Sequence, residues 1–318
     1  MFKKNFLNSW SLSLTVLFMF ITISIIVPEI SVSAQSHQPL IDEWQYNLEN
    51  FNAQSIAIDA ENNIYIGTTD NTVRKIDSNG NLIWSFEGHT GPVQAIALDN
   101  DGNIYSGSSD NTLRKINNNG QEVWQYDRHW SNVTSVVVDS DGFIYTGSRD
   151  DLVRKFDTDG NRLWTFEGHD APVHAIAVDS AGNVFSGSTD NTLRKINEDG
   201  NQVWQYNNHW DAVTAIAVDN EDNIISGSRD SNIRKFNQNG TRLWTYSGHS
   251  GTIQSIDIDF QNNIYTGSTN NELIKLNSNG NEIWKYQDIA DGILSIKLDN
   301  QNNIYVTDNN MHIKRFTQ

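Results

Sequence analysis

The 318-residue chain contains no cysteine, which excludes disulfide bonds, a cysteine nucleophile and a lipid-modified cysteine. It also has no Gly-x-Ser-x-Gly nucleophile elbow, no phosphate-binding loop and no histidine-rich metal motif. Stability must therefore come from a packed core, for which a chain of this length is ample. These absences favour a protein without catalytic activity.

Positive charge is scarce, because 22 Lys and Arg stand against 39 Asp and Glu, for a formal net charge of −17. An acidic surface argues against nucleic acid or an anionic membrane as the partner. The acidic residues are spread through predicted turns and do not form a run, so no disordered acidic arm is expected.

Long hydrophobic runs are missing except near the N-terminus, where Leu12 to Val27 is uncharged and mostly apolar. This run follows Lys3-Lys4 and precedes the small residues Val32-Ser33-Ala34, as in a secretory signal peptide covering residues 1–34. An uncleaved membrane anchor is the alternative, although the run is short for a span. Residues 35–40 read as a linker. The protein is thus expected to be exported, whether secreted, periplasmic or at the cell surface.

The rest of the chain, residues 41–318, repeats a unit of forty residues without drift in spacing. Its tryptophan recurs seven times, at Trp44, Trp84, Trp124, Trp164, Trp204, Trp244 and Trp284. Residues 87–126 and 167–206 are about two thirds identical. Because 87–166 resembles 167–246 more than its own halves resemble each other, the pattern also suggests an ancestral two-blade duplication.

Each unit predicts four short strands and no helix, since no segment has helical spacing over twelve residues. In the second unit the strands are 93–98, 103–108, 113–117 and 122–126, separated by turns such as Asp101-Gly102 and Asn119-Gly120. Such a unit cannot bury both faces alone, so seven units predict an all-β, seven-bladed β-propeller with four antiparallel strands per blade. The chain ends on a third strand, 313–316, so we expect the N-terminal strand 41–46 to complete the last blade.

The first half of the unit resembles a WD repeat. The likeness rests on Gly88-His89, on the strand 93–97, and on Ser106-Gly107-Ser108-Ser109-Asp110. The Trp-Asp pair that names the family is replaced here by pairs such as Ile116-Asn117 and Phe156-Asp157. The likeness implies a histidine–aspartate bond in each blade, namely His89 with Asp110, His129 with Asp150, His169 with Asp190 and His209 with Asp230. His249 would face Asn270.

The second half of the unit resembles the quinoprotein, or PQQ-like, propeller repeat through its Gly-x-x-x-Trp ending, as in Gly80 to Trp84. The likeness implies that each tryptophan docks between blades. These endings are packing features, so no quinone cofactor is implied and none is expected. The turn 99–105 is similar to NHL-type propeller repeats.

Several patterns have a structural explanation. Five histidines occupy the same position in successive repeats, one per blade, and are therefore too far apart for a metal site: His89, His129, His169, His209 and His249. The Asp-x-Asp-Gly turns lack the glutamate that a calcium loop needs at its twelfth position. The periodic tryptophans are expected in the core. No metal site is predicted.

Function is sought where the repeat is broken. Only the third and fifth units have a tryptophan after the histidine, Trp130 and Trp210, and only they carry Arg149 and Arg229 after the second strand. We expect Trp130 to stack on Arg149, and Trp210 on Arg229, as cation–π pairs. Two interpretations stay open: structural plugs between blades, or two binding spots on one face.

The sequence therefore predicts an exported binding or scaffold module that contacts a protein through its top-face loops. A lectin-like carbohydrate binder is the alternative, and a propeller hydrolase or lyase is a further one. The partner is expected to be a protein or a glycan, with no nucleic acid, no membrane beyond the signal peptide and no cofactor. The protein is expected to be a monomer.

Overall fold

The computed structural model describes residues 40–48, 50–289 and 291–317, and the side chains of residues 41–44 are not described. The predicted signal peptide and all of the predicted linker except Leu40 lie outside these residues. In the part of the chain that the structure describes, no helix has the length and apolar character to cross a membrane.

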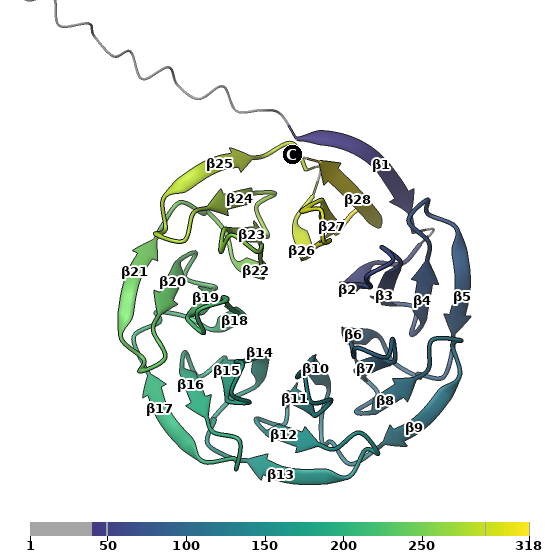
Figure 1. The fold of residues 1–318 in the computed structure, drawn as a ribbon, viewed down its shortest axis with the longest axis horizontal. Coiled ribbons are helices and arrows are strands. Elements are labelled where there is room, and N and C mark those ends of the chain that lie inside the picture. The colour runs from purple at the N-terminus through teal and green to yellow at the C-terminus, as the bar shows by residue number, and fades with distance from the viewer. Residues whose placement is uncertain (1–39, 49, 290, 318) are drawn as a thin grey trace, which may run out of the picture. The chain divides into compact units, whose positions relative to one another are not determined.

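Residues 40–317 form a ring of seven four-stranded antiparallel sheets, as the repeat predicts (Figure 1). Each sheet is a blade, and its strands are called a to d from the centre outward. Blade 1 consists of β2 (Ala53–Ile58), β3 (Ile64–Thr68), β4 (Val73–Ile76) and β5 (Leu82–Phe86). Blade 2 consists of β6 (Val93–Leu98), β7 (Ile104–Ser108), β8 (Leu113–Ile116) and β9 (Glu122–Tyr126). Blade 3 consists of β10 (Val133–Val138), β11 (Ile144–Ser148), β12 (Val153–Phe156) and β13 (Arg162–Phe166).

The remaining blades repeat this order. Blade 4 consists of β14 (Val173–Val178), β15 (Val184–Ser188), β16 (Leu193–Ile196) and β17 (Gln202–Tyr206). Blade 5 consists of β18 (Val213–Val218), β19 (Ile224–Ser228), β20 (Ile233–Phe236) and β21 (Arg242–Tyr246). Blade 6 consists of β22 (Ile253–Ile258), β23 (Ile264–Ser268), β24 (Leu273–Leu276) and β25 (Glu282–Tyr286). Blade 7 consists of β26 (Ile293–Leu298), β27 (Ile304–Asp308), β28 (His312–Thr317) and the N-terminal strand β1 (Ile41–Asn47).

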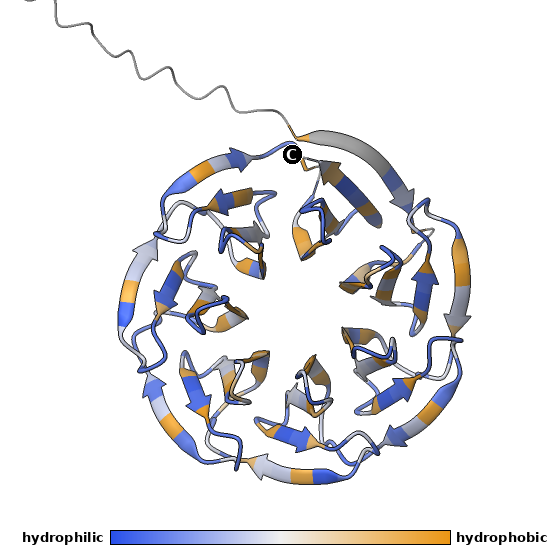
Figure 2. Cartoon of the chain, viewed as in Figure 1, coloured by the Kyte–Doolittle hydropathy of each residue, from blue (hydrophilic) through white to orange (hydrophobic). Residues whose placement is uncertain are grey.

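Strand b of every blade is buried along its whole length, whereas the first two residues of strand d are exposed in blades 1 to 6. Figure 2 shows the corresponding hydropathy, with single hydrophobic bands between polar residues on the outermost strands. The apolar clusters lie between blades. One of them joins Tyr65 and Val73 of blade 1 to Val93 and Ile96 of blade 2. Adjacent blades therefore share each core, and a single blade could not bury its faces alone.

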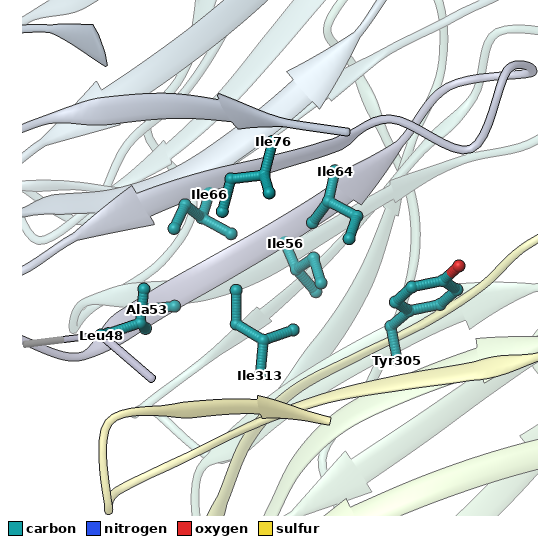
Figure 3. Close-up of a cluster of buried hydrophobic side chains, with 8 residues drawn as sticks. All are labelled: Leu48, Ala53, Ile56, Ile64, Ile66, Ile76, Tyr305 and Ile313. Carbon is teal, nitrogen blue, oxygen red and sulfur yellow. The ribbon is translucent and has the colours of Figure 1, made fainter. Parts of the chain in front are cut away.

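The N-terminal strand closes the ring, as predicted. β1 pairs antiparallel with β28, with Gln45 opposite Lys314 and Tyr46 opposite Ile313. Figure 3 shows the apolar cluster beside this junction, to which Leu48 contributes next to blade 1 residues and Tyr305 and Ile313 of blade 7. Because this core joins the two ends of the described chain, β1 is held by packing as well as by hydrogen bonds.

The repeated tryptophans dock between blades, as the PQQ-like resemblance implies. Trp84 Nε1 of blade 1 donates to Asn118 O in the c–d hairpin of blade 2 at 3.0 Å, and its ring lies against Gly120. Gly120 has a φ of 80°, and a Cβ there would lie 2.9 Å from Trp84 Cδ2. The next four tryptophans make the equivalent bond, each to a carbonyl 34 residues later.

The tryptophans pack against the buried clusters between blades, as a role in the core predicts, but they lie at the outer margin of these clusters. The six whose side chains are described, from Trp84 to Trp284, are half-buried on the outer strands. The rings from Trp84 to Trp244 cover the glycine of the neighbouring c–d hairpin and stay partly exposed. The tryptophans therefore join blades near the circumference of the ring.

Candidate binding site on the top face

The d–a loops and the b–c turns lie on one face of the ring, called the top face here. In blade 3 the N–H of Trp130, in the d–a loop, donates to Asp150 Oδ2 in the b–c turn at 2.9 Å. The N–H of Arg149 donates in return to Asn132 O at 2.9 Å. Blade 5 repeats both bonds with Trp210, Asp230, Arg229 and Ala212. The two kinds of loop thus hold each other in place.

Blades 2 and 4 contain the histidine–aspartate pair that the WD resemblance implies. His89 Nδ1 lies 2.9 Å from Asp110 Oδ2, and its Nε2 lies 2.8 Å from Ser106 Oγ. Blade 4 repeats the arrangement, with 2.8 Å between His169 Nδ1 and Asp190 Oδ2. Burial would raise the pKa of Asp110, but hydrogen bonds from His89 and Thr112 outweigh it and hold that pKa well below its usual range.

Blades 3 and 5 do not contain the predicted pairs. The two oxygens of Asp150 accept from Arg154 at 3.0 and 2.8 Å, and Arg234 binds Asp230 in the same way. The Nδ1 atoms of the two histidines, His129 and His209, have no hydrogen-bond partner among the described residues. Burial, followed by the charge of Arg154, lowers the pKa of His129 to about 3. The histidines of these blades are therefore buried and neutral.

The first residue of strand d explains the alternation. In blade 2 Arg114 reaches outward to Glu122. In blade 4 Arg194 donates to Gln202 at 3.0 Å and makes a longer contact of 3.4 Å to Asp190 Oδ2, so the aspartate still bonds to His169. In blades 3 and 5 that position holds Arg162 or Arg242, which offers no acceptor and repels a second guanidinium. The strand c arginine therefore turns to the aspartate and replaces the histidine.

Blade 6 also differs from the prediction, because His249 does not face Asn270. Its Nδ1 lies 3.1 Å from Glu272 Oε2, and Glu272 Oε1 accepts from Lys285 at 2.7 Å. Burial would raise the pKa of Glu272, but the bonds from Lys285 and Ser250 lower it to about 2. A longer carboxylate two residues downstream therefore replaces the aspartate.

Trp130 and Trp210 are exposed by 79% and 83%, respectively. Such exposure contradicts the interpretation of these residues as plugs between blades. The predicted cation–π pairs are absent too, since the described residues contain no such contact between Trp130 and Arg149 or between Trp210 and Arg229. The arginines instead line the mouth of the central channel.

The size of the second residue of strand a differs between the blades whose b–c turn places an arginine at this mouth and those whose b–c turn does not. Gln94 of blade 2 and His174 of blade 4 are long enough to bond the short residue of their own b–c turn, at 3.1 Å to Ser109 and at 2.8 Å to Thr189. Blades 3 and 5 have threonine there instead. Thr134 and Thr214 bond backbone carbonyls of their own and the next blade. The smaller side chains leave room for Arg149 and Arg229.

The channel mouth is a cavity of about 390 Å³ without acidic residues in its lining. Arg149, Arg229 and His174 contribute its charged and titratable groups, from three consecutive blades. Neither guanidinium forms an ion pair or a side-chain hydrogen bond within the described part of the chain. Burial, then the charges of Arg229 and Arg149, lowers the pKa of His174 to about 4. His174 is therefore neutral near neutral pH, between two positive charges.

The sequence prediction missed His174 and the threonines, although a signal existed. Position two of strand a reads Gln, Gln, Thr, His, Thr, Gln and Leu around the ring, and Thr coincides with arginine in the b–c turn. The predicted Trp130, Arg149, Trp210 and Arg229 do lie on the same face. Among the described residues, no group of three or more His, Asp or Glu is arranged to hold a metal ion.

The fold and this face define a class: a seven-bladed β-propeller with WD-like top loops and PQQ-like tryptophan docking. The model of the family described as outer membrane protein assembly factor BamB matches residues 41–153 and 149–291. The chain therefore belongs to this family.

Among solved structures, the crystal structure of the WD40 β-propeller domain of Doa1 is similar, with a TM-score of 0.79 and 18% identity. The alignment covers 88% of this chain and 98% of that chain. At this identity the likeness shows the fold alone. A comparison with curated proteins found no match to the sequence.

Proposed function

We propose that this protein is an exported, non-enzymatic binding module that holds a protein partner on its top face. The observation that carries the proposal is the pair of exposed indoles, Trp130 and Trp210, on the two blades that also send Arg149 and Arg229 to the channel mouth. Tryptophan and arginine concentrate binding energy in protein interfaces. Two indoles exposed by 79% and 83% offer large apolar contact surfaces, each with an N–H that can donate to a partner.

The loops that present the indoles are well supported. The N–H of each tryptophan is bonded to an aspartate that a buried arginine in strand c also holds. A partner would therefore meet a preformed surface and would not need to order these loops, which lowers the entropic cost of binding. Family membership supports an extracytoplasmic location and a role in assembly with other proteins.

The test compares partner capture by the wild type and by a Trp130→Ala, Trp210→Ala variant from the extracytoplasmic fraction. Since each indole is exposed, the variant should keep its melting temperature and lose the partner at least tenfold. The matched control is Phe260→Ala, which removes an aromatic side chain of 73% exposure from the a–b turn on the opposite face and should bind normally. Equal capture by all three proteins would contradict the proposal.

A carbohydrate ligand is the second candidate, because an exposed indole face can also stack on a sugar ring. A glycan array with the same three proteins distinguishes the two. Glycan binding that is lost in the tryptophan variant alone would replace the protein partner with a lectin function.

A further inference from the structure

The channel mouth differs in charge from the rest of the molecule. The chain has 39 acidic residues, yet none of them lines this cavity, where Arg149, Arg229 and His174 meet. In an acidic protein, a cavity lined by positive charges has a locally positive potential that attracts negatively charged groups. The cavity volume of about 390 Å³ suits one or two side chains or a small molecule, but not a folded element.

The aspartate that follows each of these arginines in the sequence is already bonded to another arginine. Arg149 precedes Asp150, but both oxygens of Asp150 are already bonded to Arg154. Arg229 precedes Asp230, which is occupied by Arg234 in the same way. The alternation between blades therefore leaves two guanidinium groups, each with five donors, free at one opening.

His174 completes the donor set between them. Its Nε2 lies 2.8 Å from Thr189 Oγ1, which fixes the ring, and its Nδ1 makes no hydrogen bond within the described part of the chain. With Nε2 as the acceptor of the threonine hydroxyl, Nδ1 carries the proton and can donate to a ligand. A neutral donor flanked by two cations is a suitable arrangement for an anionic oxygen group.

We propose that the channel mouth binds carboxylate side chains of an acidic peptide segment, held by Arg149, Arg229 and His174. The inference rests on the proposed function, since it names the chemistry of the partner that Trp130 and Trp210 engage. A free inorganic anion would use the cavity alone. A peptide would use the cavity and the indoles together, because the same two blades carry both. Arginine suits this task, as its planar fork matches a carboxylate.

The experiment measures binding of an acetylated, amidated Glu-rich peptide by calorimetry, with its Gln-for-Glu counterpart and inorganic phosphate as further probes. The proteins are the wild type, Arg149→Gln, Arg229→Gln, and the control Arg128→Gln, which removes one positive charge from the same face outside the cavity lining. We expect the Glu-rich peptide to bind, each cavity variant to lose about tenfold in affinity, and Arg128→Gln to stay within about twofold.

Three results would overturn the inference: equal binding of the Gln counterpart, equal loss in Arg128→Gln, or no peptide binding. Binding of phosphate without the peptide would assign the cavity to a free anion and likewise reject the peptide. The Trp130→Ala, Trp210→Ala capture experiment separates this inference from the proposed function. If binding of the partner depends on the tryptophans but not on the arginines, the proposed function is retained and the inference of an acidic peptide segment is rejected.

Discussion

At the scale of the residue, one position on strand d changes the chemistry of a whole blade. Glu122 or Gln202 accepts a hydrogen bond from the strand c arginine, which in blade 4 keeps a longer contact of 3.4 Å to the aspartate. Where strand d begins with Arg162 or Arg242, the strand c arginine instead binds the aspartate through both terminal nitrogens. Only in the second case is the histidine left without a partner for Nδ1. The WD-like pairing is therefore decided by a side chain outside the motif that suggests it.

The buried histidines make the stability of the protein depend on pH. Burial is the main cause that lowers the pKa of His129 and His209 to about 3 and that of His174 and His249 to about 4. An unfolded histidine takes up a proton near pH 6.5, so the unfolded chain gains protons first as the pH falls. The free energy of unfolding should thus decrease from about pH 6.5 to about pH 4, by at most about 1.4 kcal/mol per pH unit for each histidine.

Urea unfolding at about pH 7 and about pH 5 measures this dependence. A His129→Gln, His209→Gln variant keeps a polar side chain near Thr146 and Ser226 but does not titrate, so its stability should fall less between the two pH values. A wild type and variant with identical pH dependence would show that these histidines are not buried in the neutral form.

At the scale of the element, the c–d hairpin receives the tryptophan of the preceding blade and so adds a second contact between blades to their shared apolar core. Gly120 and Gly102 both have positive φ, at 80° and 76°, but a Cβ at Gly120 would lie 2.9 Å from Trp84 and one at Gly102 no closer than 3.5 Å to Asn118. The two glycines therefore allow the cost of φ to be separated from the cost of displacing the docked tryptophan.

We expect Gly102→Ala to destabilise the protein by about 1 kcal/mol through backbone strain alone. Gly120→Ala should cost about 1–3 kcal/mol more, because the tryptophan ring must shift. Thermal unfolding of the two variants measures the difference. Equal effects would mean that the tryptophan adapts freely and that the interblade contact is loose.

Much at this scale could be predicted from the sequence. Strands 93–98 and 122–126 begin and end as predicted, because short apolar segments and their turn residues are local signals. The orientation of Arg149 could not be predicted in the same way. It depends on the size of Thr134, a residue on another strand, and on the bond between Asp150 and Arg154. The stacking of Trp130 on Arg149 is predicted from loops on the same face of one blade, and a shared face does not determine which way two side chains turn.

At the scale of the whole molecule, the ring is closed by pairing of its first and last strands. β1 contributes the outer strand of blade 7, and Leu48, directly after it, packs into the core shared with blade 1. Closure of this kind removes the open edge that a sheet would otherwise expose.

Deletion of residues 41–46 should therefore lower the melting temperature strongly and make the protein prone to association through the unpaired edge of β28. Deletion of residues 35–39 provides the control and should leave both properties unchanged. Light scattering during thermal unfolding reports the two effects together. A melting temperature that survives the loss of 41–46 would mean that the other strands hold the ring alone.

The measurement that tests the central claim most directly is the amide hydrogen-exchange footprint of the captured partner on the unaltered protein. We expect protection in the d–a loops 127–132 and 207–212 and at the channel mouth around His174, with no change in the a–b turn that carries Phe260. Protection of the a–b turns in place of these loops would contradict this claim, because the binding surface would then lie on the opposite face.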